Sequence, residues 1–176
     1  MFTAYKLPDV YQELSVDTSQ LGCLMIHTEN PFSFTGTLEE GDEYYSPNYP
    51  YVKGLVTQDW HATVRHGFLP GVKRKHVDRV AINFGLPKTL TGLGFEVFPS
   101  VSATEEYECV VLRVSGKELV DLHLGLGVLP NIMTFPEYKP HITFGYFRKG
   151  WYFQNGRNLD FKMSIPVEDF YYGETL

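Results

Sequence analysis

Two copies of one short pattern, a histidine, any residue, a threonine and an apolar residue, lie eighty positions apart in the chain. They are His61-Ala62-Thr63-Val64 and His141-Ile142-Thr143-Phe144. Side chains two positions apart on a β-strand point to the same face of the sheet. Each copy therefore predicts a strand that presents an imidazole and a hydroxyl on one face and two apolar side chains to a core. A fold for this chain must bury both apolar faces and bring the two polar faces to a common space.

The chain is long enough to bury a core within one domain. It has 176 residues, of which 43% are hydrophobic and 20% charged, and we expect residues 1–176 to form a single domain. The formal net charge of −6 argues against binding to long nucleic acids, because that affinity comes largely from Lys and Arg side chains that neutralise phosphates. A small anionic substrate in a local pocket is compatible with this charge.

The ends and the cysteines of the chain bear on its location. The first residues, Met1–Pro8, lack the basic and then apolar pattern of a secretory signal, and no apolar run approaches the roughly 18 residues of a membrane span. We therefore expect a soluble, cytoplasmic protein without a membrane partner. Cys23 and Cys109 lie in apolar, strand-like settings without a CxxC pattern, which favours reduced thiols over a disulfide.

Periodicity along the chain predicts an α+β fold. Strands are expected at residues 21–26, around each motif, at 94–99, at 107–114 and within 159–170. Helical spacing of apolar residues predicts helices over 77–84 and 117–126. Strands interspersed with two helices in this order favour an antiparallel or mixed sheet with the helices on its outside.

A long segment rich in Gly, Glu, Asp and Tyr, residues 35–50, precedes the first motif. It is either a flexible flap over a site or an ordinary surface loop, and typical loop lengths favour the second interpretation.

Three further side chains are candidates for binding a substrate. Arg65 shares the face of His61 and Thr63 if the strand continues, where it would meet a phosphate or remain a solvated charge. Trp151 follows the second motif in a Gly-flanked turn, where an exposed indole would stack on a base and a buried one would join the core. Tyr51 has the same two interpretations.

The other histidines do not form a metal-binding pattern. His27, His66, His76 and His123 have no HExxH or comparable spacing, so we expect neither a metal site nor a cofactor. A lone strand histidine is usually structural, whereas the matched pair of motifs favours catalysis.

The pair of motifs resembles the signature of the two-histidine (2H) phosphoesterase superfamily, which is defined by two His-x-Thr/Ser-apolar motifs. The order of elements also matches, so the resemblance covers most of residues 21–170. It implies two pseudosymmetric α+β lobes, with antiparallel or mixed sheet and outer helices, around a central cleft. The stretch Thr134-Phe135-Pro136-Glu137-Tyr138-Lys139-Pro140-His141-Ile142-Thr143 is most similar to the phage branch. Members of that branch include anti-CBASS phosphodiesterases, which destroy the cyclic oligonucleotide signals of bacterial antiphage defence. The long, Tyr-rich segment before His61 departs from the family pattern.

The resemblance implies that His61, Thr63, His141 and Thr143 form a catalytic tetrad. One imidazole would take a proton from the attacking hydroxyl and the other would give one to the leaving oxygen, while the threonines hold phosphate oxygens. The sequence does not say which histidine is the base.

We therefore expect a metal-independent phosphodiesterase that hydrolyses cyclic di- or trinucleotides. The resemblance implies that this is a phage protein that counteracts CBASS signalling in the host cytoplasm. We expect it to be a monomer. Two alternatives remain open. One is a 2′,3′-cyclic phosphodiesterase that acts on RNA ends or small nucleotides, and the other is a non-catalytic sponge that sequesters the signal.

Overall fold

The computed structural model describes residues 20–133 and 137–173 of the chain. The strands are β1 (Gly22–Thr28), β2 (Phe32–Phe34), β3 (His61–Phe68), β4 (Thr89–Pro99), β5 (Tyr107–Ser115), β6 (His141–Arg148), β7 (Leu159–Phe161) and β8 (Ser164–Gly173). The helices are α2 (Arg74–Ala81), α3 (Lys117–Gly125) and α4 (Trp151–Asn155), with short 3-10 turns η2 (Leu126–Val128) and η3 (Gly156–Asn158). The stretch Met1–Pro8 and the first three residues of the stretch 134–143 lie outside the described residues.

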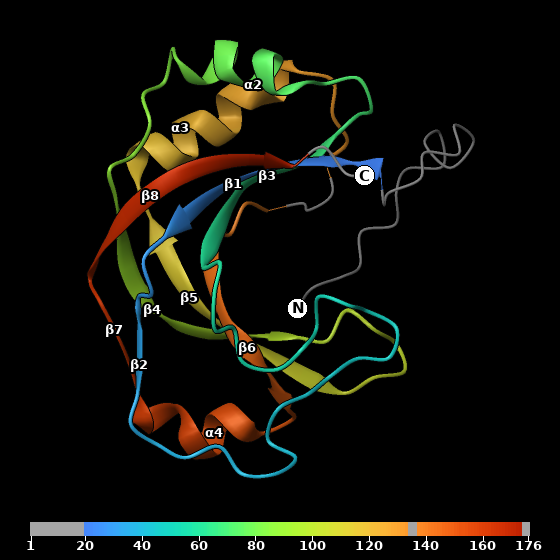
Figure 1. Ribbon diagram of the computed structural model, residues 1–176, viewed down its shortest axis with the longest axis vertical. Coiled ribbons are helices and arrows are strands. Elements are labelled where there is room, and N and C mark those ends of the chain that lie inside the picture. The colour runs from blue at the N-terminus through green and yellow to red at the C-terminus, as the bar shows by residue number, and fades with distance from the viewer. Residues whose placement is uncertain (1–19, 134–136, 174–176) are drawn as a thin grey trace.

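Six strands pair in a closed ring in the order β1-β3-β6-β5-β4-β8, and β2 pairs with β7 in a separate two-stranded sheet. Every pairing between these strands is antiparallel, so the described part contains no parallel pair of the kind a mixed sheet requires. Figure 1 shows α2 and α3 together at one end of the curved sheet and α4 at the opposite end. The expected α+β class is confirmed.

Two apolar clusters hold the elements together. The larger one joins the inward side chains of the ring to α2 and α3, and it includes the motif residues Ala62, Val64 and Ile142. The smaller one consists of Val110, Phe144, Phe147 and Trp151 and lies beside α4. All the apolar motif positions are thus buried, as the alternation of a strand predicts.

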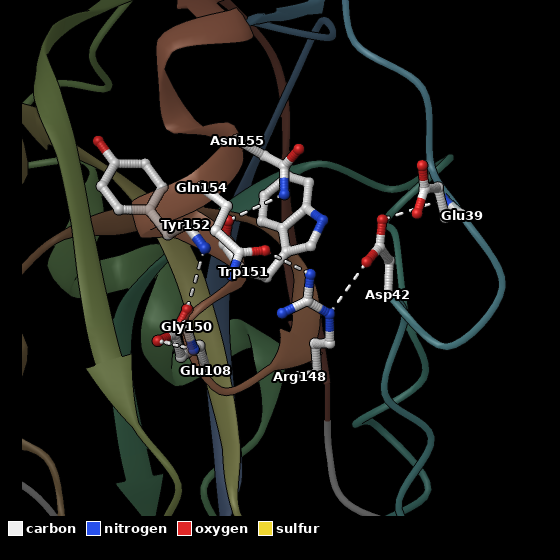
Figure 2. A network of polar contacts seen from close by, with 9 residues as sticks. All are labelled: Glu39, Asp42, Glu108, Arg148, Gly150, Trp151, Tyr152, Gln154 and Asn155. Carbon is white, nitrogen blue, oxygen red and sulfur yellow. Dashed lines mark hydrogen bonds and ion pairs between the residues drawn. The ribbon is translucent and has the colours of Figure 1, made fainter.

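The sequence pattern located most elements but missed the shortest. The strand expected within 159–170 is two strands, because β7 ends at Phe161 and β8 begins at Ser164. β2 and α4 were not predicted, since three and five residues are too few to show a period. The start of α4 is held by Glu108, whose carboxylate accepts hydrogen bonds from the backbone N–H groups of Gly150 at 2.6 Å and Tyr152 at 3.1 Å (Figure 2).

The Tyr-rich segment before β3 extends the sheet along the second half of β6. Tyr44 N–H donates to Tyr146 O, and Tyr146 N–H donates to Gly54 O, both at 3.0 Å. Asp42, which is buried, fixes the start of this segment through an ion pair with Arg148 (Figure 2). The segment is therefore tied to the sheet by backbone hydrogen bonds at several points.

Among the described residues, no helix combines the length and the apolar character that crossing a membrane would need.

Candidate active site

The two motifs lie side by side, at the point where β3 and β6 meet. Ala62 pairs with Ile142 in antiparallel register. Because antiparallel neighbours run in opposite directions, this pair places His61 level with Thr143 and Thr63 level with His141. The imidazole of each strand thus faces the hydroxyl of the other, on the face opposite the core.

Both motif histidines are oriented in the same way by the backbone. Nδ1 of His61 lies 2.8 Å from the carbonyl oxygen of Asp59, and Nδ1 of His141 lies 2.7 Å from that of Lys139. A carbonyl oxygen can only accept, so Nδ1 carries the proton in each ring. The neutral rings therefore have an unprotonated Nε2, and that nitrogen is available to take or give a proton.

The same irregularity follows the threonine in each strand. The register shifts at Val64, between the pairs Leu24–Arg65 and Met25–Thr63, and at Phe144, between Val110–Gly145 and Val111–Thr143. Each shift is a β-bulge in which one strand has an extra residue. The fourth residue of each motif is thus the bulged one, and the residues after it change face.

The neighbouring strands, β1 beside β3 and β5 beside β6, repeat the same arrangement. His27 pairs with His61 as Arg113 pairs with His141, and Cys23 pairs with His66 as Cys109 pairs with Tyr146. The two halves of the site therefore share a register as well as a motif.

Burial makes the imidazole of His141 less basic than an ordinary histidine side chain. The pKa of His141 is lowered, mainly because burial disfavours the charged ring. Electrostatic repulsion from Arg113 and from the ring of His61 lowers the pKa of His141 further, whereas the hydrogen bond to Lys139 O acts in the opposite direction. The edge of the ring also packs against Phe98, with centroids 4.8 Å apart. At neutral pH this environment favours the neutral ring.

Each threonine hydroxyl has a cysteine beside it. Cys23 forms a side-chain hydrogen bond with Thr63, and Cys109 forms one with Thr143. Burial nevertheless raises the pKa of Cys23 to about 11 and that of Cys109 to about 12, so both free thiols stay protonated. The thiols are thus weak polar neighbours of the threonines rather than nucleophiles.

The backbone of Thr63 is supported from the α3 side. Tyr138 donates its hydroxyl hydrogen to Thr63 O at 3.0 Å, and His123 Nδ1 lies 2.7 Å from Val64 O. The rings of His123 and Tyr138 stack with centroids 3.8 Å apart. Two side chains, rather than the backbone of β6, therefore form hydrogen bonds with these two carbonyl groups of β3.

Arg65 does not share the face of His61 and Thr63, and that expectation was wrong. The bulge at Val64 turns Arg65 to the side of its partner Leu24, and it is only 8% exposed. Its guanidinium donates to His123 O, near the end of α3, at 2.9 Å and to Asn131 Oδ1 at 2.7 Å. A cation beside the last carbonyls of a helix is stabilising, which gives Arg65 a structural role.

The two aromatic candidates differ in exposure. Trp151 is 0% exposed, and its ring stacks on Phe147 with centroids 3.8 Å apart. Trp151 is therefore a core residue and not an exposed ring on which a base could stack. Tyr51 is 57% exposed and lies edge-on to Tyr146, with centroids 6.4 Å apart. Tyr146 is on β6 just beyond the bulge, so Tyr51 lies at the border of the motif face.

His27 is the neighbour of the site that sequence patterns missed. Its ring lies 6.1 Å from that of His61, stacks on Tyr171 at 5.8 Å, and has Nδ1 2.8 Å from Asp169 Oδ1. Only the pairing of β1 with β3 brings His27 next to His61, so no local spacing could have revealed it. His66, whose pKa is lowered by burial, likewise reaches this face only because of the bulge.

In the part of the chain that the structure describes, no three His, Cys, Asp or Glu side chains are grouped as ligands for a metal ion. A scan against protein-family models finds no match for this chain, and a search of curated proteins finds none either.

Proposed function

We propose that this protein is a 2H-type phosphodiesterase that hydrolyses cyclic oligonucleotides without a metal ion. The observation that carries the proposal is the cross-strand register, which sets each motif histidine level with the threonine of the other strand. The repeated register of β1 with β3 and of β5 with β6 supports a pseudosymmetric, two-lobed version of the α+β fold.

His141 is the general base in this proposal and His61 the general acid. The environment of His141 lowers its pKa and keeps its Nε2 unprotonated at neutral pH, as a base requires. His141 removes the proton from the attacking hydroxyl, and His61 gives a proton to the leaving oxygen through its own Nε2. The carbonyl groups of Asp59 and Lys139 keep both rings in the tautomer that this exchange needs.

The threonines stabilise the phosphate as negative charge develops on it. Thr63 lies level with His141 and Thr143 level with His61, and in this proposal their hydroxyls donate hydrogen bonds to the non-bridging oxygens. When a ribose 2′-hydroxyl adjoins the scissile 3′-phosphodiester, that hydroxyl attacks, the bond to the leaving 5′-oxygen breaks, and a 2′,3′-cyclic phosphate remains.

A small cyclic nucleotide fits the site better than a polynucleotide. The net charge is −6, and Arg65 is buried away from the motif face, where its guanidinium donates hydrogen bonds to His123 O and Asn131 Oδ1. Tyr51 offers an exposed ring on which a base would stack. Destruction of a cyclic nucleotide signal in the cytoplasm of an infected bacterium, by a phage protein that counteracts CBASS, is the setting that we propose.

The mechanism is tested by removing one imidazole at a time. His61→Ala or His141→Ala should lower the turnover of a cyclic dinucleotide at least about a hundredfold while the fold is retained, because each removes the acid or the base. His76→Gln is the matched control, since His76 is on α2 and Gln also serves at this capping position. Near-normal turnover by either folded alanine variant would contradict the mechanism, as would an equal loss in the control.

A further inference from the structure

Each motif histidine is faced, from the strand on its outer side, by a side chain that can carry positive charge. Arg113 of β5 pairs with His141, and His27 of β1 pairs with His61. Side chains directly opposite each other in an antiparallel pair share a face, with Cβ atoms about 4.5–5.5 Å apart. Arg113 therefore lies on the motif face, next to the imidazole of His141.

Both of these outer side chains are held by a carboxylate from the next strand of the ring. Arg113 Nη1 donates to Glu96 Oε2 of β4 at 2.8 Å, and His27 Nδ1 lies 2.8 Å from Asp169 Oδ1 of β8. The same arrangement thus recurs on the two sides of the motif strands. A side chain that is already fixed loses little further freedom when a ligand binds.

The guanidinium of Arg113 keeps donors for a ligand. A guanidinium has five N–H groups. Hydrogen bonds to other described residues engage Nη1, which donates to Glu96, and Nε, which donates to Pro140 O at 3.3 Å. Within the same part of the chain, no hydrogen bond of Nη2 is present. The side chain is 25% exposed, so a ligand can reach it.

The charges around Arg113 are compatible with an anion. Burial is the main cause that lowers the pKa of His141, and repulsion from Arg113 adds to it, which agrees with the short distance that the register implies. Glu96 is shared with Lys139, whose Nζ lies 3.9 Å from Glu96 Oε1 and 3.7 Å from the exposed Glu137. A second cation therefore partly neutralises the carboxylate that anchors Arg113, and this lessens its repulsion of an anion.

We propose that Arg113 binds, through Nη2, a non-bridging oxygen of the phosphate that lies on the motif histidines. A guanidinium suits this role because it stays charged and its planar donors match the geometry of phosphate oxygens. The position of that phosphate rests on the proposed function. An anion site at Arg113 can nevertheless be measured without turnover.

Titration of the intact chain with inorganic phosphate in EDTA tests this site, with the imidazole NMR signals of His61 and His141 as the readout. Phosphate should shift both signals in a saturable manner. Arg113→Gln should weaken phosphate binding at least about tenfold, because it removes a charge-assisted hydrogen bond. Arg113→Lys keeps the charge but loses the planar fork, and it should weaken binding at least about threefold.

Two further variants separate ligand binding from a purely structural ion pair. Glu96→Gln retains an oxygen that accepts a hydrogen bond from Arg113 and removes a negative charge, so phosphate should bind at least as tightly as in the parent protein. Arg74→Gln is the matched control. Arg74 also pairs with a carboxylate, that of Asp78 at 3.0 Å, but it lies on α2, and its loss should leave phosphate affinity unchanged.

The proposal would be overturned by parent-like phosphate affinity in Arg113→Gln or in Arg113→Lys, or by the absence of saturable binding in the parent protein. A loss in Glu96→Gln equal to that in Arg113→Gln would make Arg113 a structural residue instead.

Turnover distinguishes this proposal from the proposed function. In Arg113→Gln the kcat for a cyclic dinucleotide should fall at least about tenfold, because negative charge on the bound oxygen grows in the transition state. Unchanged turnover in that variant would remove the role of Arg113 but keep the enzyme. Phosphate binding that requires Arg113, without turnover of any cyclic nucleotide, would keep the anion site and remove the enzyme.

Discussion

Trp151 and Tyr51 are both aromatic residues near the second motif, but Trp151 is buried in the core and Tyr51 is exposed. Mutation can distinguish a core role from a binding role. Trp151 is fully buried among Phe34, Phe144 and Phe147. Trp151→Ala removes the largest side chain of the smaller cluster, and such truncations cost about 3–5 kcal/mol in the free energy of unfolding. For a chain of this size, that loss lowers the melting temperature by roughly 6–20 °C.

Tyr51→Ala should have the opposite profile. Because Tyr51 is 57% exposed, its truncation should change the free energy of unfolding by no more than about 0.5 kcal/mol. If its ring stacks on a base, the affinity for a nucleotide should fall by about 1–3 kcal/mol. Urea unfolding followed by circular dichroism measures stability, and calorimetric titration at a temperature where both variants are folded measures affinity.

The comparison has a clear contrary outcome. Trp151→Ala should bind the nucleotide with nearly unchanged affinity in its folded form. A Trp151→Ala variant that unfolds like the parent protein but fails to bind would refute the assignment of Trp151 to the core. A Tyr51→Ala variant with unchanged affinity would refute the stacking role of Tyr51.

Three further results are expected. Burial raises the pKa of Cys23 to about 11 and that of Cys109 to about 12, so iodoacetamide at pH 8 should label neither thiol until urea unfolds the chain. Rapid labelling of the folded chain would contradict the burial of the thiols. The pKa of His141 is lower in the folded chain than its usual 6.5, so the unfolded chain binds more protons below that pH, and stability should fall as the pH drops from 6.5 toward the folded pKa. His141→Gln should flatten this dependence in urea unfolding between pH 5 and 8, and an unchanged slope would count against it. Asp42→Asn should lower the free energy of unfolding by about 1–2 kcal/mol, because it weakens the ion pair with Arg148, and an unchanged thermal midpoint would show that the pair is dispensable.

The sequence predicts the motif strands well because their information is local. Alternation within His61–Val64 and His141–Phe144 is enough to place histidine and threonine on one face, and the structure has both apolar positions of each strand in the core. Most long elements also followed from periodicity, since a pattern over seven or more residues is distinguishable from chance.

The sequence does not show where a bulge interrupts the alternation of a strand. It also does not show which residues become neighbours through strand pairing. The bulge at Val64 reverses the face of Arg65, and the sequence carries no signal that distinguishes this from a regular strand. His27 becomes a neighbour of His61 through strand pairing alone. α4 is a single short turn, stabilised by the carboxylate of Glu108 from another strand, so its residues have no helical period to read.

The most direct test of the central claim is a product analysis of the intact protein. The protein is incubated in EDTA with cyclic di- and trinucleotides of 3′,5′ and 2′,5′ linkage and with a 2′,3′-cyclic mononucleotide, and the products are resolved by mass. We predict linear oligonucleotides that end in a cyclic or an open phosphate. Opening of the mononucleotide alone would assign the protein to RNA-end processing. Tight binding without any product, or activity only after a metal ion is added back, would contradict metal-independent cleavage of cyclic oligonucleotides.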